Sequence, residues 1–146
     1  MINTTLGKIA QLRDEVGPRG TVVRQGPLSK LSSAGDQTPF AARFLISRFL
    51  KVVLTELRTY EETALKLGQK YGHPSPEHDN KIVVDGPNLE TYRAELRALD
   101  DVAITLPVPP LPVATLEHAG LTPRDLLLLE DFITPPETPV LPPTSS

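Results

Sequence analysis

A heptad of apolar and aromatic side chains runs through the middle of the chain without a gap. Two interleaved series, each with a spacing of seven residues, make up this seam: Ile46, Val53, Tyr60 and Leu67, and Leu50, Leu57, Ala64 and Tyr71. The spacing places all of these side chains on one narrow stripe of an α-helix, and such a stripe packs lengthwise against another helix. We therefore expect a mainly α-helical fold organised around the seam.

Residues at both ends of the seam mark where this long helix starts and stops. The Thr38 oxygen can accept from unpaired backbone amides of the first turn, and Pro39 at the first helical position has no amide to leave unpaired. Gly72 is expected to cap the other end, so the sequence predicts a helix over residues 39–71. Four cations lie off the seam, on a face that we expect to be solvated: Arg43, Arg48, Lys51 and Arg58.

A second seam marks a shorter helix over residues 88–100. Its apolar positions follow Asn88, a good cap residue, at spacings of three and four: Leu89, Tyr92, Leu96 and Leu99. Two seams joined by a loop predict an antiparallel helical hairpin, whose shorter arm covers about half of the longer one. The rest of the long seam must pack on the N-terminal helix, the C-terminal helix or a second copy. We assign self-association in a homo-oligomer to this part, namely Ile46, Leu50, Val53 and Leu57.

Short elements flank the two long helices. Leu6, Ile9 and Leu12 have the spacing of a short helix near the N-terminus. Residues 21–25 and 81–84 are rich in β-branched side chains and are typical of short strands.

A short apolar helix is predicted near the end of the chain. Thr122 and Pro123 repeat the start signal, and Asp125 stands three residues past the cap, close to a capping box. The expected buried stripe is Leu126, Leu129 and Ile133, widened by Leu127, Leu128 and Phe132. A helix this short and apolar must be buried against something.

Proline is concentrated in the last third of the chain, where ten of the 16 prolines lie at or after Pro107. Because proline donates no backbone hydrogen bond and has a fixed φ, residues 107–113 are predicted to form an extended strap across the helices. We divide the chain into a single helical domain, residues 1–133, and an extended proline-rich C-terminal tail, residues 134–146.

Composition argues against several classes of function. The absence of cysteine excludes disulfides, thiolate catalysis and cysteine-based zinc sites. A net charge of −3 gives no general attraction for nucleic acid or an anionic membrane, and we expect neither as a direct partner. The most apolar stretch, residues 44–54, is interrupted by Arg48 and Lys51 and is about half as long as a membrane span. The N-terminus lacks the pattern of a secretory signal.

No motif predicts an enzyme, a metal site or a cofactor. His73 and His78 share one loop with Glu77 and Asp79, but their spacing matches no metal site, so we expect exposed loop residues there. The third histidine, His118, stands apart. The serine pairs at residues 32–33 and 145–146 have no histidine or lysine at a motif distance, so a hydrolase is a third-ranked hypothesis that would require activity dependent on a histidine.

Five features follow one another along the chain in a fixed order. They are a leucine-rich opening (6–12), a long charged helix (40–72) ending Gln69-Lys70-Tyr71-Gly72, an acidic helix (88–100), a β-like segment (102–106) and a Pro-containing turn before a leucine-rich helix (121–133). This order resembles a family of small, uncharacterised proteins of tailed bacteriophages. Residues 17–30 and the strap depart from the pattern. The family has no established reaction, so the resemblance implies a phage context and no catalytic residue.

We therefore expect a non-enzymatic structural or assembly protein of a tailed-phage particle, in which strap and tail clasp other phage structural proteins. The expected partner-binding residues are Leu127, Leu128, Phe132, Val140, Leu141, Pro142 and Pro143. For the tail motif at residues 139–143, a disordered end is an equal alternative to a binding segment. The alternative function is a small phage regulator in the host cytoplasm that binds and inhibits a host protein.

Overall fold

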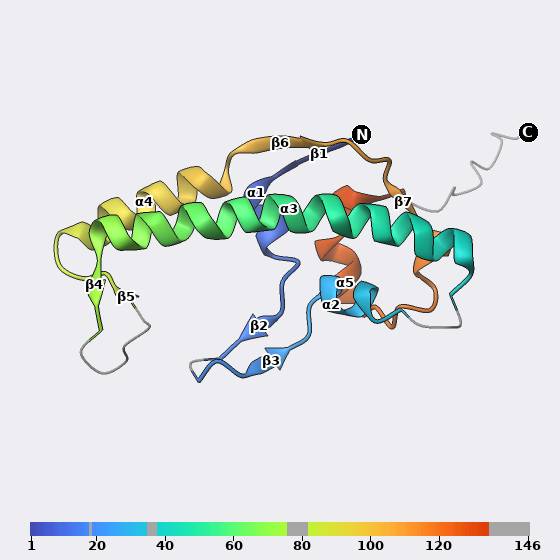
Figure 1. The fold of residues 1–146 in the computed structure, drawn as a ribbon, viewed down its shortest axis with the longest axis horizontal. Coiled ribbons are helices and arrows are strands. Elements are labelled where there is room, and N and C mark those ends of the chain that lie inside the picture. The colour runs from blue at the N-terminus through green and yellow to red at the C-terminus, as the bar shows by residue number, and fades with distance from the viewer. Residues whose placement is uncertain (18, 35–37, 76–81, 135–146) are drawn as a thin grey trace, which may run out of the picture.

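One long helix spans the molecule and organises the rest of the fold (Figure 1). The computed structural model describes residues 1–17, 19–34, 38–75 and 82–134. Within them are five α-helices, which confirm a mainly α-helical fold: α1 (Leu6–Ala10), α2 (Pro27–Ser32), α3 (Phe40–Tyr71), α4 (Asn88–Asp100) and α5 (Pro123–Leu128). The same ranges contain two short 3-10 helices, η1 (Val113–Leu116) before α5 and η2 (Glu130–Phe132) after it.

In the described part of the chain, eight short strands form four separate two-stranded pairs. Three pairs are antiparallel: β1 (Ile2–Thr5) with β6 (Ala103–Leu106), β2 (Glu15–Val16) with β3 (Val22–Arg24), and β4 (His73–Pro74) with β5 (Ile82–Val83). The fourth pair, β7 (Leu111–Pro112) with β8 (Ile133–Thr134), is parallel. No strand is shared between two of these pairs, so the described strands do not build one larger sheet.

The two ends of α3 differ in how well the sequence predicted them. The N-cap is Pro39, and the Thr38 side chain is buried with its hydroxyl oxygen unpaired, so the prediction of a Thr38 cap is wrong. Gly72 caps the C-terminus as predicted, and its N–H donates to the Gly68 carbonyl over 2.8 Å. Only glycine fits there, because an added Cβ would collide with the Ile82 side chain of β5.

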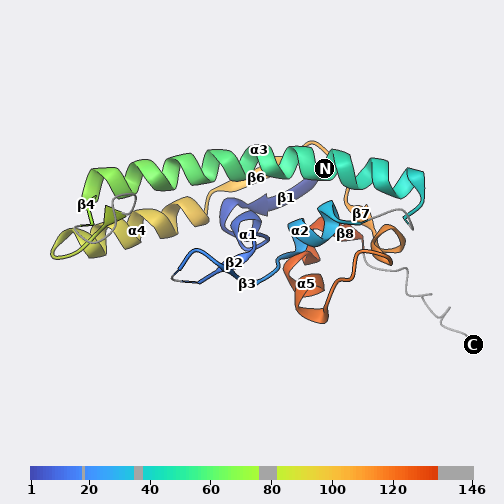
Figure 2. The same cartoon turned by 60° about the horizontal axis from the view of Figure 1, so that its bottom comes forward.

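Helix α4 has the predicted bounds and lies beside the C-terminal half of α3 (Figure 2). Its contacts with α3 are partly polar: Tyr60 donates to Asp100 over 2.7 Å, and Tyr71 donates to Glu95 over 2.9 Å. Burial, followed by the hydrogen bond to Asp100, raises the pKa of Tyr60 to about 12. The apolar side chains of α4 are only partly buried, so the α3–α4 contact lies at the edge of the core.

The core lies under the N-terminal half of α3. Its inward stripe is Ala42, Ile46, Phe49, Val53 and Leu57, and each of these residues is less than a tenth exposed. Segments from both ends of the chain cover the stripe, principally α1, α2, β7 and η1. The seam residues assigned to self-association are therefore covered within the chain, apart from the half-buried Leu50. Of the three packing partners that the sequence allowed for this part of the seam, the structure shows the N-terminal helix, together with residues 111–116.

An aromatic pair joins α3 to the last described segment. The rings of Phe49 and Phe132 meet edge to face, with centroids 5.8 Å apart and an interplanar angle of 74°. Both side chains are at most 1% exposed. Edge-to-face pairs add stabilisation beyond the area that they bury, so this contact holds η2 firmly under α3.

The β1–β6 pair brings the N-terminus alongside residues 103–106. Ile2 lies opposite Leu106, and both are buried. Thr5 ends strand β1 and also caps α1, because its hydroxyl accepts from the Lys8 backbone N–H over 3.3 Å. Further along, Val108 and Leu111 of residues 107–113 are buried against the core.

We expect Phe49→Ala to lower the free energy of unfolding by about 3–5 kcal/mol, because it leaves a cavity beside Phe132. Phe44→Ala is the matched control, since Phe44 lies on the same helix with 54% of its surface exposed; it should change stability by about 0.5 kcal/mol or less. Urea unfolding of both variants would measure this, and equal losses would contradict the core described above.

Candidate interaction surface

Helix α5 begins with a complete capping box, as the sequence predicted. The Thr122 hydroxyl accepts from the Asp125 N–H over 3.2 Å, and the Asp125 carboxylate accepts from the Thr122 N–H over 2.9 Å. Both hydrogen bonds satisfy amides that a helix start leaves unpaired. The capping box therefore fixes the direction in which α5 leaves the preceding turn.

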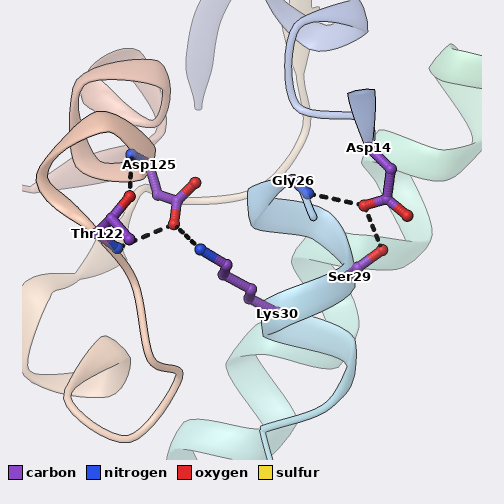
Figure 3. Close-up of polar contacts among 6 residues, drawn as sticks. All are labelled: Asp14, Gly26, Ser29, Lys30, Thr122 and Asp125. Atoms are coloured by element: carbon purple, nitrogen blue, oxygen red, sulfur yellow. Dashed lines mark hydrogen bonds and ion pairs between the residues drawn. The ribbon is translucent and has the colours of Figure 1, made fainter. Parts of the chain in front are cut away.

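Asp125 is also half of a buried ion pair that joins α5 to α2 (Figure 3). Its carboxylate lies 2.5 Å from Lys30 Nζ, and the Asp125 side chain is 3% exposed. Burial by itself would raise the pKa of the Asp125 carboxyl, but hydrogen bonds from Lys30 and Thr122 outweigh it. The pKa of Asp125 consequently lies below its usual value, and the carboxylate stays ionised with its partners.

A second carboxylate holds the other end of α2. Asp14 accepts from the Gly26 N–H and the Ser29 hydroxyl, each over 2.7 Å, and thereby satisfies the start of that helix (Figure 3). The Gly26 backbone bond, followed by the Ser29 bond, lowers the pKa of Asp14. Gly26 must lack a side chain because a Cβ would collide with the Arg13 backbone. Both carboxylates are occupied by structural contacts, and neither is placed as an acid or a base.

The outer face of α5 presents leucines to the surface. Leu126 is 40% and Leu127 72% exposed, whereas Leu129 is fully buried. The predicted buried stripe is thus wrong at Leu126 and at Leu127, because Asp125 takes an inward position to reach Lys30. Leu127 remains available for binding, and Leu128 is partly buried.

The other expected partner-binding residues lie elsewhere. Phe132 is a core residue packed on Phe49, so it is not available to a partner in this fold. Val140, Leu141, Pro142 and Pro143 lie outside the described residues.

The β2–β3 ribbon is a second apolar surface, which sequence reasoning did not identify. Val16, Val22 and Val23 are each more than half exposed. The sequence does predict a strand here, but valines in a strand ordinarily indicate burial, and no local pattern shows that this ribbon projects from the core (Figure 1).

An open groove of about 440 Å³ lies between this ribbon and α5. Three arginines line it, and two of them approach one carboxylate: Glu15 lies 3.8 Å from Arg24 and 4.0 Å from Arg124. Arg13 lines the groove as well, and Leu128 forms part of its wall. Asp14 and Glu15 line the groove too, and Arg13 pairs with Glu61 over 3.5 Å, so an acidic segment of another protein would have to replace these internal carboxylates as the partners of the arginines.

The described residues contain no group of three or more histidine and acidic side chains that could hold a metal ion. His73 instead contacts the Pro74 carbonyl and Asp85, both over 3.2 Å, and these contacts raise its pKa. His78, Glu77 and Asp79 lie outside the described residues, and His118 is exposed. No helix in the described ranges is long and apolar enough to cross a membrane.

Comparisons with known proteins found no match: no protein-family model, no curated protein and no solved structure is similar to this chain.

Asp125 should make folding stability depend on acid pH. Since its folded pKa is below its unfolded pKa, the ion pair stabilises the protein above about pH 4, and this contribution is lost as pH falls through the folded value. We expect Asp125→Asn to cost about 3 kcal/mol at neutral pH, because Lys30 loses its partner. The variant should also lose less stability than the wild type between about pH 5 and pH 2.

Asp131→Asn provides the control for this measurement. Asp131 pairs with Lys8 over 2.7 Å, but both side chains are about a third or more exposed. A pair of this kind contributes about 1 kcal/mol or less. The measurement is urea unfolding of the wild type, Asp125→Asn and Asp131→Asn between about pH 5 and pH 2. Parallel stability profiles for the wild type and Asp125→Asn would refute a stabilising role for the Asp125 ion pair.

Proposed function

We propose that this protein is a non-enzymatic structural or assembly protein of a tailed-bacteriophage particle, which binds neighbouring subunits through helical surfaces and proline-rich extensions. The observation that carries the proposal is Leu127, 72% exposed on a helix that the capping box and the Lys30–Asp125 pair hold in place. An apolar anchor on a rigid element loses little conformational entropy on docking, so it suits a permanent contact.

The proposed body is the antiparallel hairpin of α3 and α4 within a single domain of residues 1–133. Residues 107–113 act as a strap on this body, which the burial of Val108 and Leu111 supports. We assign the proline-rich tail of residues 134–146 to contact with a neighbouring subunit on its composition alone, since proline lowers the entropy that a segment loses on docking. The phage context rests on the order of sequence features that resembles the tailed-phage family.

The alternative is a small phage regulator that binds and inhibits a host protein in the cytoplasm. The groove beside the β2–β3 ribbon favours it, because an acidic surface of such a target can replace Glu15 as the partner of Arg24 and Arg124. The two functions differ in where the protein accumulates. A particle component has a fixed copy number in the virion, whereas a regulator is abundant in infected cells and absent from particles.

Quantitative mass spectrometry of purified particles should find this chain at a fixed ratio to the major capsid protein. We expect Leu127→Asp to lower that occupancy by about tenfold or more, because it places a charge at a buried anchor of the contact. Leu65→Asp is the matched control, since Leu65 is 55% exposed on the distant half of α3. Absence of the wild-type chain from particles, with abundant protein in infected cells, would favour the regulator instead.

A further inference from the structure

The outer side of the first half of α3 carries an unbalanced positive charge. Four exposed cations occur in residues 40–58, and the single acid there, Glu56, is half-buried. None of these cations has an ion pair among the described residues: Arg43, Arg48, Lys51 and Arg58. Arg48 lies over the ring of Phe44, 6.0 Å from its centroid. The chain as a whole has a net charge of −3, so this face is a local exception that favours an acidic partner over a basic one.

A mainly apolar groove adjoins these cations. It is open, measures about 420 Å³, and lies between α3 and the start of residues 107–113. Val52 and Thr55 form its helical wall, and Pro107 and Val108 form the other. Arg48, Lys51 and the half-buried Glu56 line the same groove, so its two cations outnumber its one acid. It can therefore receive an apolar side chain together with a nearby carboxylate, and we call it the receiving groove.

The leucine face of α5 has the complementary chemistry. Leu126, Leu127 and Glu130 are exposed, and Glu130 follows the two leucines by four and three residues, so each leucine lies on the same side as Glu130. Residues 123–132 contain three acids and one arginine. Glu130 has no ion pair among the described residues, whereas Asp125 and Asp131 are paired with lysines.

The two surfaces lie on different sides of α3. Phe132 holds the end of α5 against Phe49 on the inward stripe, and α5 lies below α3 in both views (Figures 1 and 2). The connection from β6 to β7, which forms one wall of the receiving groove, passes above α3. One copy can therefore present both surfaces to different neighbours at the same time.

We propose that copies of this chain associate head to tail: Leu126 and Leu127 of one copy enter the receiving groove of the next, and Glu130 pairs with Arg48 and Lys51. The inference rests on the proposed function in taking α5 as a binding surface, and it names a second copy as the partner. A symmetric contact between two α3 outer faces would oppose cations to cations, which is unfavourable. A head-to-tail contact pairs opposite charges and continues into a ring or a filament.

Two variants of the full chain test the contact. Leu127→Asp disables the inserting surface and leaves the receiving groove intact. The double variant Arg48→Glu with Lys51→Glu disables the groove and leaves the leucines intact. Sedimentation velocity should show the wild type in assemblies larger than a dimer and each variant as a monomer. An equimolar mixture should form a dimer and stop there, because only one productive contact remains between the two variants.

Charge exchange gives a second readout. Adding Glu130→Lys to Arg48→Glu with Lys51→Glu reverses both sides of the contact and should restore assembly. The control is Lys66→Glu with Lys70→Glu, which makes the same charge change on an exposed part of α3 outside the groove and should leave assembly unchanged. Raised salt should weaken the wild-type contact, since exposed charge pairs are screened.

The outcomes separate this inference from the proposed function. A wild type that stays monomeric at every concentration overturns the head-to-tail contact, as does a mixture of the two variants that remains monomeric while the wild type assembles. If Leu127→Asp nevertheless loses particle occupancy, α5 binds a different subunit, and the proposed function stands without self-association. If the chain assembles in solution but is absent from particles, the head-to-tail contact stands and the proposed function is overturned.

Discussion

The packing of Phe132 on Phe49 is the contact on which the rest of the structure depends. Phe49 lies on the inward stripe of α3, and Phe132 belongs to the last described helix, so the pair closes the core between segments that are far apart in sequence. Because α5 leads directly into η2, the position of Phe132 also determines where the exposed leucines of α5 can lie. The same short segment thus supplies a core contact and the proposed binding surface.

Polar contacts then determine which side of α5 faces outward. Asp125 turns inward to meet Lys30 of α2, and α2 is itself held at its start by Asp14. Burying a carboxylate is costly unless it is paired and hydrogen-bonded. Here Lys30 pairs with the Asp125 carboxylate, and the Thr122 N–H donates a further hydrogen bond to it. With Asp125 inside, Leu126 and Leu127 are directed to the surface. The apolar anchor that carries the proposed function therefore depends on a buried polar network.

The candidate surface was only partly predictable from the sequence. Leu127 was identified because a short apolar helix needs something to cover it, and the structure shows this side chain exposed. The same argument wrongly included Phe132, since a pattern of leucines and a phenylalanine cannot show which of them a distant aromatic ring will cover. The valines of the β2–β3 ribbon were missed for the converse reason, because their exposure results from how the ribbon projects from the body. The receiving groove also requires residues from α3 and residues 107–108 to meet.

By itself the sequence determined the features that depend on neighbours within about one helical turn. These include the extents of α3 and α4, the Gly72 cap and the capping box of α5, and the exclusion of cysteine chemistry. Only the tertiary structure decided that α1, α2 and residues 111–116 cover the long seam, and that Asp125 is buried while Leu127 is not. Burial of a side chain depends on residues brought close from elsewhere in the chain, and Lys30 and Asp125 are 95 positions apart. A local pattern carries no information about such a partner.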